Sequence, residues 1–185
     1  MVSAPLWLVI AAAIKADSPG PVFFRQARVG ERGRSFNALK FRSMVVEAEH
    51  RGPVQATEHD ARVTRLGRVL RATAMDELPQ LWNILRGDMS IVGPRALRPD
   101  EVEVRTVGAS VPLDAVPGFK ERSSVRPGLT GLAQIYAPRD VLRRQKFRYD
   151  NLYVRRRSFG LDIRLIALSF WITARGTWES RGRKF

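Results

Sequence analysis

Residues 73–95 read TAMDELPQLWNILRGDMSIVGPR and place two carboxylates, Asp76 and Glu77, side by side. The residues after them predict the start of a helix, with Asp76 as its N-cap and Pro79 in the first turn, where a missing N–H costs nothing. A carboxylate there lies in the positive field of the helix terminus, so it stays ionised and can hold a cation or attack phosphorus. The pair is therefore either a reactive site or a plain helix cap.

Arginine side chains flank this pair on both sides. Upstream, residues 62–71 (RVTRLGRVLR) space their apolar side chains at helical intervals, and Arg71 ends this predicted basic helix only five residues before Asp76. Downstream, Gly87 begins a turn, and residues 91–95 predict a short extended segment that ends at Arg95. Cationic side chains are thus present in the sequence on either side of the carboxylates.

The composition restricts the chemistry in which the pair could take part. The 185 residues suffice for one domain, 1–185, with a real core. There is no cysteine, which excludes disulfides, thiolate nucleophiles and cysteine metal sites. Only two histidines are present, His50 and His59, so a histidine triad or a multi-histidine zinc site is not expected. Any nucleophilic or acid–base chemistry therefore falls to carboxylates.

The charge balance is strongly basic, with 32 Lys and Arg against 18 Asp and Glu and a net charge of +14. Such an excess needs a polyanionic neighbour: nucleic acid, an acidic membrane surface or phosphorylated substrates. Residues 143–157 are especially basic, with the aromatic side chains of Phe147, Tyr149 and Tyr153 interleaved. The overall content of hydrophobic residues (44%) and charged residues (27%) nevertheless predicts a folded protein.

Two apolar segments lie near the ends of the chain. Residues 5–14 (PLWLVIAAAI) fall far short of the roughly 20 residues that a spanning helix needs. They predict either a buried core helix or a segment that enters one leaflet without crossing, and Trp7 and Lys15 suit the second interpretation. Residues 161–173 are apolar nearly all round, which is typical of a helix that is buried or lies against lipid.

Two further segments could bind anions. Residues 22–29 and 35–44 predict a β-hairpin with its turn at 30–33, and Lys40 and Arg42 share one face of the second strand. That face is either solvated or a phosphate cradle. Residues 126–134 (RPGLTGLAQ) leave backbone amides free to approach an anion, although this signal is weak by itself.

The remaining segments are less informative. Residues 45–62 are polar and predict a helix plus a loop, and residues 99–119 predict mostly loop. Within the second of these, Glu101 and Glu103 form another acidic pair, which we interpret as a solvated face.

Five segments, in order, resemble the catalytic domain of the bacterial sugar transferases, the monotopic polyprenyl-phosphate phosphoglycosyl transferases. They are DSPGPVFFRQARVG (17–30), KFRSM (40–44), DELPQLWNILRGDMSIVGPR (76–95), RPGLTGLAQ (126–134) and the YDNLY…S…LD pattern at 149–162. The resemblance implies transfer of a sugar-1-phosphate from a nucleoside-diphosphate sugar, most simply a UDP-sugar, to polyprenyl (undecaprenyl) phosphate, with release of a nucleoside monophosphate. This would be the first membrane step of bacterial polysaccharide or glycoconjugate synthesis.

The resemblance also implies roles for residues. Asp76 matches the family's nucleophile, which forms an acyl-phosphate with the sugar-bearing phosphate, and Glu77, together with Asp76, is associated with Mg²⁺. A diphosphate needs cationic neutralisation, which arginine supplies better than lysine because its contacts are bidentate. The candidates for substrate and phosphate binding are Lys40, Arg42, Arg71, Arg95, Arg126 and Gln134.

The fold implied by the resemblance is of the α+β class. It is a compact, mainly helical, membrane-associated domain with a β-hairpin and an N-terminal re-entrant hydrophobic helix, here truncated to residues 1–16, while residues 161–175 form an interfacial or core helix. The expected location is the cytoplasmic face of the bacterial inner membrane. The expected partners include the lipids of that membrane but no nucleic acid, and a homo-oligomer is a further possibility. Ala96 departs from the family pattern, which has proline there, and leaves the shape of that loop undecided.

Two other functions compete with this hypothesis. The basic and aromatic residues of 143–157 would suit a nucleic-acid-binding protein, but the charge is spread over the whole chain and no recognised binding module is present. An inert membrane scaffold of the same fold is the second alternative, and the intact Asp76–Glu77 pair argues against it.

Overall fold

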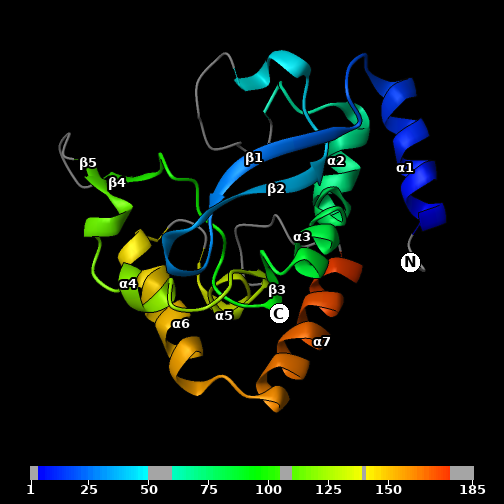
Figure 1. Cartoon of the computed structure of the whole chain (residues 1–185). Helices are drawn as coiled ribbons and strands as arrows, with labels where there is room; N and C mark the ends of the chain where they lie inside the picture. Colours follow the sequence, from blue (N-terminus) through cyan, green and yellow to red (C-terminus); the bar gives the residue numbers. More distant parts are fainter. Residues whose placement is uncertain (1–3, 50–59, 105–109, 139–140, 176–185) are drawn as a thin grey trace.

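A β-hairpin runs across the middle of the protein, where the sequence predicted it (Figure 1). The computed structural model describes residues 4–49, 60–104, 110–138 and 141–175. Strand β1 (Phe23–Val29) pairs antiparallel with β2 (Ser35–Phe41) along its whole length. The turn holds the single 3₁₀ turn η1 (Glu31–Gly33), in which Arg32 has a positive φ of 53°. The hairpin prediction is therefore confirmed.

The stretch around Asp76 folds as separate short helices. Helix α2 (Arg65–Ala72) starts at Thr64, whose side chain accepts a hydrogen bond from the Gly67 amide. The 3₁₀ turn η3 (Met75–Glu77) follows, and α3 (Gln80–Arg86) comes next. The predicted basic helix before the carboxylate pair is thus confirmed, with a side-chain cap at its start.

The N-cap role predicted for Asp76 is wrong. Ala74 adopts a left-handed conformation, with φ 53° and ψ 17°, which separates α2 from the next helical turn. A helical turn therefore begins already at Met75, and Asp76 lies inside η3, while Pro79 occupies the cap position of α3. The consequence is that both carboxylates project from one tight turn rather than from a helix terminus.

Two distant glycine-rich segments meet in a short parallel pair of strands. Strand β3 (Ser90–Val92) lies beside β6 (Gly128–Thr130). Their backbones approach so closely that a Cβ on Gly128 would clash with the backbone of Gly93, so both positions require glycine. This contact brings the segment that ends at Arg95 next to the predicted anion-binding segment 126–134.

The C-terminal helices cover this pair of strands. They are α5 (Leu132–Tyr136), α6 (Arg143–Arg156) and α7 (Phe159–Ala174). A hydrophobic cluster joins all three to β3, and its buried members are Val92, Ile135, Tyr153, Leu165 and Ile172.

The N-terminal apolar segment forms helix α1 (Ala4–Asp17). Ile10 and Ile14 are buried against β2 and α2, whereas Leu8 and Val9 are 73% and 66% exposed. The helix is therefore neither fully buried nor fully solvated. None of the described helices combines the length and the apolar character needed to cross a membrane.

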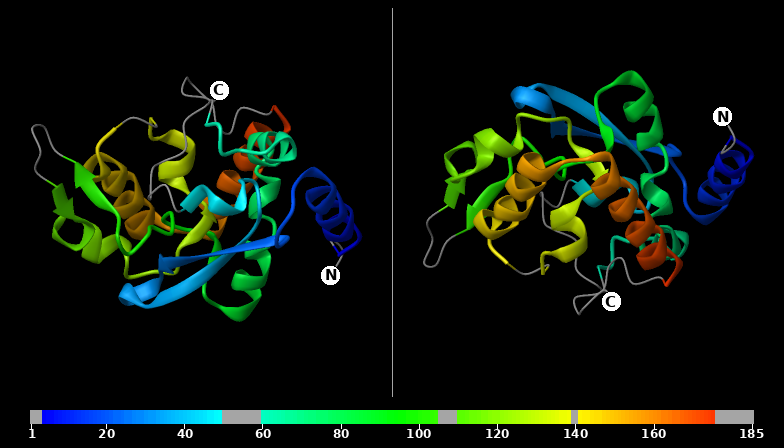
Figure 2. Two further views of the ribbon diagram at one scale, coloured as in Figure 1. Left: turned by 90° about the horizontal axis from the view of Figure 1, so that it is seen from above. Right: turned by 90° about the horizontal axis from the view of Figure 1, so that it is seen from below.

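A second, smaller hairpin lies in the region predicted to be mostly loop. Strands β4 (Val102–Val104) and β5 (Ser110–Pro112) pair antiparallel, and the turn η4 (Leu113–Ala115) and helix α4 (Phe119–Arg122) follow. In the views of Figures 1 and 2 this region lies at one end of the molecule, while α1, α2, α3 and α7 lie towards the other. Helices and two-stranded sheets together confirm the α+β class.

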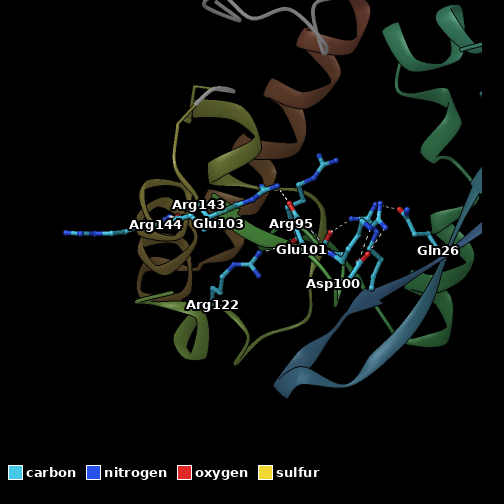
Figure 3. Close-up of polar contacts among 11 residues, drawn as sticks. Gln26, Arg95, Asp100, Glu101, Glu103, Arg122, Arg143 and Arg144 are labelled. Carbon is cyan, nitrogen blue, oxygen red and sulfur yellow. Dashed lines mark hydrogen bonds and ion pairs between the residues drawn. The ribbon is translucent and has the colours of Figure 1, made fainter. Parts of the chain in front are cut away.

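The interpretation of Glu101 and Glu103 as a solvated face is wrong. Glu103 is only 3% exposed and accepts a hydrogen bond of 2.9 Å from the Arg144 amide, while Glu101 forms an ion pair with Arg143 (Figure 3). The start of α6 packs over this acidic segment, which the local sequence could not show. Farther upstream, the described part of 45–62 contains the 3₁₀ turn η2 (Val46–Glu49); residues 50–59, with both histidines, lie outside the described residues.

Candidate active site

A small cavity of about 20 Å³ lies beside Glu77. The hairpin, η3, α3, the segment after β3 and the 128–134 segment all contribute to its wall. Its polar lining consists of Arg28, Lys40, Glu77, Gln80, Arg95 and Gln134. The structure therefore brings together Glu77, Lys40, Arg95 and Gln134, which the sequence singled out from four separate segments.

Lys40 and Glu77 form an ion pair in the wall of this cavity. Lys40 Nζ donates to Glu77 Oε1 at 2.5 Å, and both side chains are 17% exposed. Burial would raise the pKa of Glu77, but the charges of Lys40 and Arg95 outweigh it and hold that pKa below its ordinary value. Glu77 is therefore a carboxylate at neutral pH.

Asn83 holds the carboxylate turn in register with the hairpin. Its Oδ1 accepts a hydrogen bond from the Leu39 amide at 3.0 Å, and its Nδ2 donates to the Asn37 carbonyl at 2.8 Å. These bonds attach α3 to the edge of β2, and Lys40 is the next residue along that strand. The buried amide thus fixes the distance between Lys40 and Glu77, although it does not touch the cavity itself.

Asp76 lies in the same turn as Glu77 and is buried, with 9% exposure. Gln80, one turn further along the chain, is also buried and does line the cavity. The two adjacent carboxylates therefore have different surroundings, because Glu77 lines the cavity and Asp76 is not among the residues that line it.

Three predicted phosphate-binding residues lie outside this cavity. Arg42 is buried, and its Nη2 donates to the carbonyl and the hydroxyl of Ser18 at 2.6 and 2.9 Å, which attaches the end of α1 to the hairpin. Arg71 lies in the last turn of α2. Arg126 lines a separate cavity of about 420 Å³ and forms a 3.8 Å ion pair with Glu31.

Arg28 lines the small cavity and was missed by the sequence analysis. It lies on β1, and in the register of the hairpin it shares a face with Ala38 and Lys40, since Gln26 is opposite Ala38 and Phe24 opposite Lys40. Because side chains alternate between the two faces of a strand, aligning the two predicted strands would have placed Arg28 on the same face as Lys40. Burial first, and the charge of Arg95 second, lower the pKa of Arg28 to about 10, so it remains protonated at neutral pH.

A buried framework supports Arg95 from behind. Arg122 donates through Nε to Asp150 at 2.8 Å and through Nη2 to the carbonyl of Arg95 at 2.5 Å. Burial raises the pKa of Asp150, with Arg122 acting in the opposite direction. Arg143 also lies near Arg95 (Figure 3), and burial together with that neighbour lowers its pKa to about 10. Arginines thus gather on this side of the cavity.

Asp76 and Glu77 could hold a metal ion only if other groups, such as phosphates of a ligand, complete its coordination. Within the described ranges, no group of three or more His, Cys, Asp or Glu side chains is placed to hold one. Asp76 and Glu77 offer two adjacent carboxylates, and Mg²⁺ is commonly bound by one or two carboxylates together with substrate phosphates. The donor set therefore fits a Mg²⁺ ion that arrives with a phosphorylated ligand.

Comparison with known proteins agrees with these features. The family described as "Bacterial sugar transferase" matches residues 1–176. A UDP-glucose:undecaprenyl-phosphate glucose-1-phosphate transferase of Klebsiella pneumoniae is 45% identical over 170 residues, which is 89% of this chain and 35% of that protein. The enzyme of the same name from Caulobacter vibrioides is 43% identical, with coverage of 88% and 60%. The exopolysaccharide production protein PSS of Rhizobium leguminosarum bv. phaseoli is 40% identical, with coverage of 90% and 84%.

The chain thus spans about a third and three fifths of the length of the two glucose-1-phosphate transferases. The match includes all five sequence segments and every residue that lines the small cavity. On this basis, the chain belongs to the bacterial sugar transferase family.

Proposed function

We propose that this chain transfers a hexose-1-phosphate from a UDP-sugar to undecaprenyl phosphate, releasing UMP and forming undecaprenyl-diphospho-sugar. The observation that carries the proposal is the cavity in which Glu77, Lys40 and Arg95 meet beside Asp76, within a family match that covers almost the whole chain. Because the relatives from Klebsiella and Caulobacter are named for UDP-glucose, glucose-1-phosphate is the first group to test.

The proposed reaction has two displacements at phosphorus. A carboxylate oxygen of Asp76 attacks the sugar-bearing phosphorus of the donor, the bond from that phosphorus to the bridging oxygen breaks, and UMP leaves with the electron pair. An oxygen of undecaprenyl phosphate then attacks the same phosphorus, and the bond to Asp76 breaks and restores the carboxylate. Two steps let one small site serve a soluble donor and a lipid acceptor in turn.

The side chains that line the cavity with Glu77 are suited to bind and orient the donor. Lys40 and Arg95 present positive charge to a diphosphate, and Gln134 offers an amide at the same cavity. We also propose that Glu77 and Asp76 hold Mg²⁺, which when bound would neutralise charge that develops on the phosphate oxygens.

Exposed apolar side chains support a membrane location at the cytoplasmic face of the bacterial inner membrane. Nine of the exposed large apolar side chains among the described residues occur on three helices that lie towards one end of the molecule in Figures 1 and 2. They are Leu6, Leu8 and Val9 on α1, Trp82 and Leu85 on α3, and Phe159, Ile163, Phe170 and Trp171 on α7. Together with the net charge of +14, this distribution suits an anionic lipid surface, where the phosphate of the acceptor would lie.

The test is release of UMP from UDP-glucose by the protein in vesicles that contain undecaprenyl phosphate and Mg²⁺. We expect turnover in the wild type, a loss of at least about 1,000-fold in Asp76→Asn, and a phosphosugar adduct on Asp76 when acceptor is left out. The matched control is Asp114→Asn, which changes an exposed carboxylate in η4. Undiminished turnover in Asp76→Asn, or no UMP release from any UDP-sugar, would contradict the proposal.

A further inference from the structure

Arg28 has an unusual set of partners for a guanidinium in a cavity wall. Its Nη1 donates to the Ala96 carbonyl at 3.0 Å, and its Nη2 donates to Gln26 Oε1. Both acceptors are neutral, and the two bonds use only part of the donor set of a guanidinium. Within the described part of the chain, Arg28 forms no ion pair with a carboxylate. It therefore keeps both charge and N–H groups available.

The cavity as a whole has more positive than negative charge. Three cations, Arg28, Lys40 and Arg95, line it together with one carboxylate, Glu77, which is already paired with Lys40. Arg95 also makes no ion pair among the described residues. Two like charges held near each other in a partly buried wall cost free energy, and a bound anion would remove that cost. The surplus indicates a ligand with more than one negative charge.

The Arg28 side chain and the backbone that carries Arg95 are attached to each other. The amide of Val29 donates to the Leu97 carbonyl at 2.8 Å, which attaches the end of β1 to the segment that contains Arg95. The bond from Arg28 to the Ala96 carbonyl adds a second attachment at the same place. On the other side, Arg122 holds the carbonyl of Arg95. These contacts position the Arg28 side chain and the backbone of Arg95 before a ligand binds, which limits the reorganisation that phosphate binding requires.

We propose that Arg28, next to Arg95, is the binding site for the nucleoside-side phosphate of the donor, the phosphate that departs with UMP. This inference rests on the proposed function and adds to it a residue and a division of the cavity. Lys40 is held by Glu77, next to the nucleophile, and so it serves the sugar-bearing phosphate. Arg28 is anchored to the 96–97 segment instead, where it meets the second phosphate. When the bond to the bridging oxygen breaks, the negative charge gained by UMP lies beside its guanidinium.

The experiment measures UMP binding directly and donor kinetics separately, with the full chain in vesicles. Arg28→Gln removes the charge, and Arg28→Lys keeps it but removes the bidentate geometry. The matched control is Arg25→Gln, because Arg25 is on the same strand but exposed on the opposite face. We expect Arg28→Gln to weaken UMP binding by roughly 10- to 100-fold and to raise the KM for UDP-glucose similarly. Arg28→Lys should fall between, and Arg25→Gln should behave as wild type.

The outcomes separate this inference from the proposed function. Wild-type affinity for UMP in Arg28→Gln would overturn the inference even if the wild type is an active transferase. A raised KM for undecaprenyl phosphate with an unchanged KM for UDP-glucose would also overturn it, because Arg28 would then bind the acceptor. If Arg28→Gln does not fold, Arg28→Lys decides, and unchanged UMP affinity in that variant would overturn the inference. Arg28-dependent UMP binding without turnover in the wild type would instead contradict the proposed function alone.

Discussion

The Lys40–Glu77 and Arg122–Asp150 ion pairs are both short and shielded from water, yet their carboxylates differ. The pairs measure 2.5 Å and 2.8 Å. Burial acts to raise the pKa of each carboxyl group. At Glu77 the charges of Lys40 and Arg95 prevail and the pKa falls, whereas at Asp150 burial prevails over Arg122 and the pKa rises.

The difference follows from what surrounds each pair. Glu77 faces a cavity with surplus cations, so its charge is stabilised from several directions. Asp150 is 3% exposed, and its partner Arg122 lies over the ring of Phe147 at 4.8 Å and supports the carbonyl of Arg95. The first pair is therefore part of a ligand site, and the second is part of the framework that positions it. Four predictions test this division, in order of decreasing expected effect.

Glu77→Gln should lower UMP release from UDP-glucose by on the order of 100-fold, because it removes charge at the site of transfer. Its free energy of unfolding should fall by less than in Arg122→Ala, because Lys40 and Glu77 are each 17% exposed and water can solvate the cation left behind. Urea denaturation and the UMP assay measure the two effects. A variant that unfolds readily but retains its activity per folded molecule would show that Glu77 belongs to the framework.

Arg122→Ala should have the reverse profile. It leaves Asp150 buried without its partner, and we expect a loss of about 3–5 kcal/mol in the free energy of unfolding. Below the unfolding transition, UMP release per folded molecule should change far less than in Glu77→Gln. The double variant Arg122→Met with Asp150→Leu should recover part of the stability, and failure to do so would argue against an uncompensated charge as the cause.

The stability of the framework pair should respond to pH with the opposite sign from a surface pair. The exposed Arg155 and the half-buried Glu121 form such a pair at 2.6 Å, and the hydrogen bond from Arg155 lowers the pKa of Glu121. A lowered pKa adds stability at neutral pH that is lost on acidification. The raised pKa of Asp150 adds stability at low pH that is lost as the pH rises through the folded value.

The measurement is the gap in unfolding free energy between wild type and each variant, from about pH 6 to pH 3. On acidification, the wild type should become more stable relative to Asp150→Asn. It should become less stable relative to Glu121→Gln. Parallel movement of both gaps would show that burial does not dominate at Asp150.

Arg155→Gln should have the smallest effect. Its side chain is 70% exposed, so solvent screens the pair with Glu121, and the free energy of unfolding should hardly change. UMP release should stay at the wild-type rate. A loss comparable to that of Arg122→Ala would contradict the ranking by burial.

Much of the site was predictable because its residues stand in recognisable local patterns. Asp76 and Glu77 are adjacent, Lys40 lies in a strand with a clear turn before it, and Arg95 and Gln134 end two short motifs. Arg28 was missed because its relation to Lys40 depends on the register of the hairpin, in which it shares a face across two strands. Arg42 is also basic and lies two residues after Lys40, so the sequence pattern predicts the same face for both. In the structure it is buried against the end of α1.

The sequence by itself determined the hairpin, the basic helix before the carboxylates and the family, because these depend on turns, periodicity and motifs within a few residues of one another. Only the tertiary structure decided that Asp76 lies inside a 3₁₀ turn, that Glu103 and Asp150 are buried, and that Arg28 lines the cavity with Glu77. Burial and charge at each of these positions are set by segments far away in the chain. Local pattern identifies which residues can carry charge, and packing determines which of those charges remain available to a ligand.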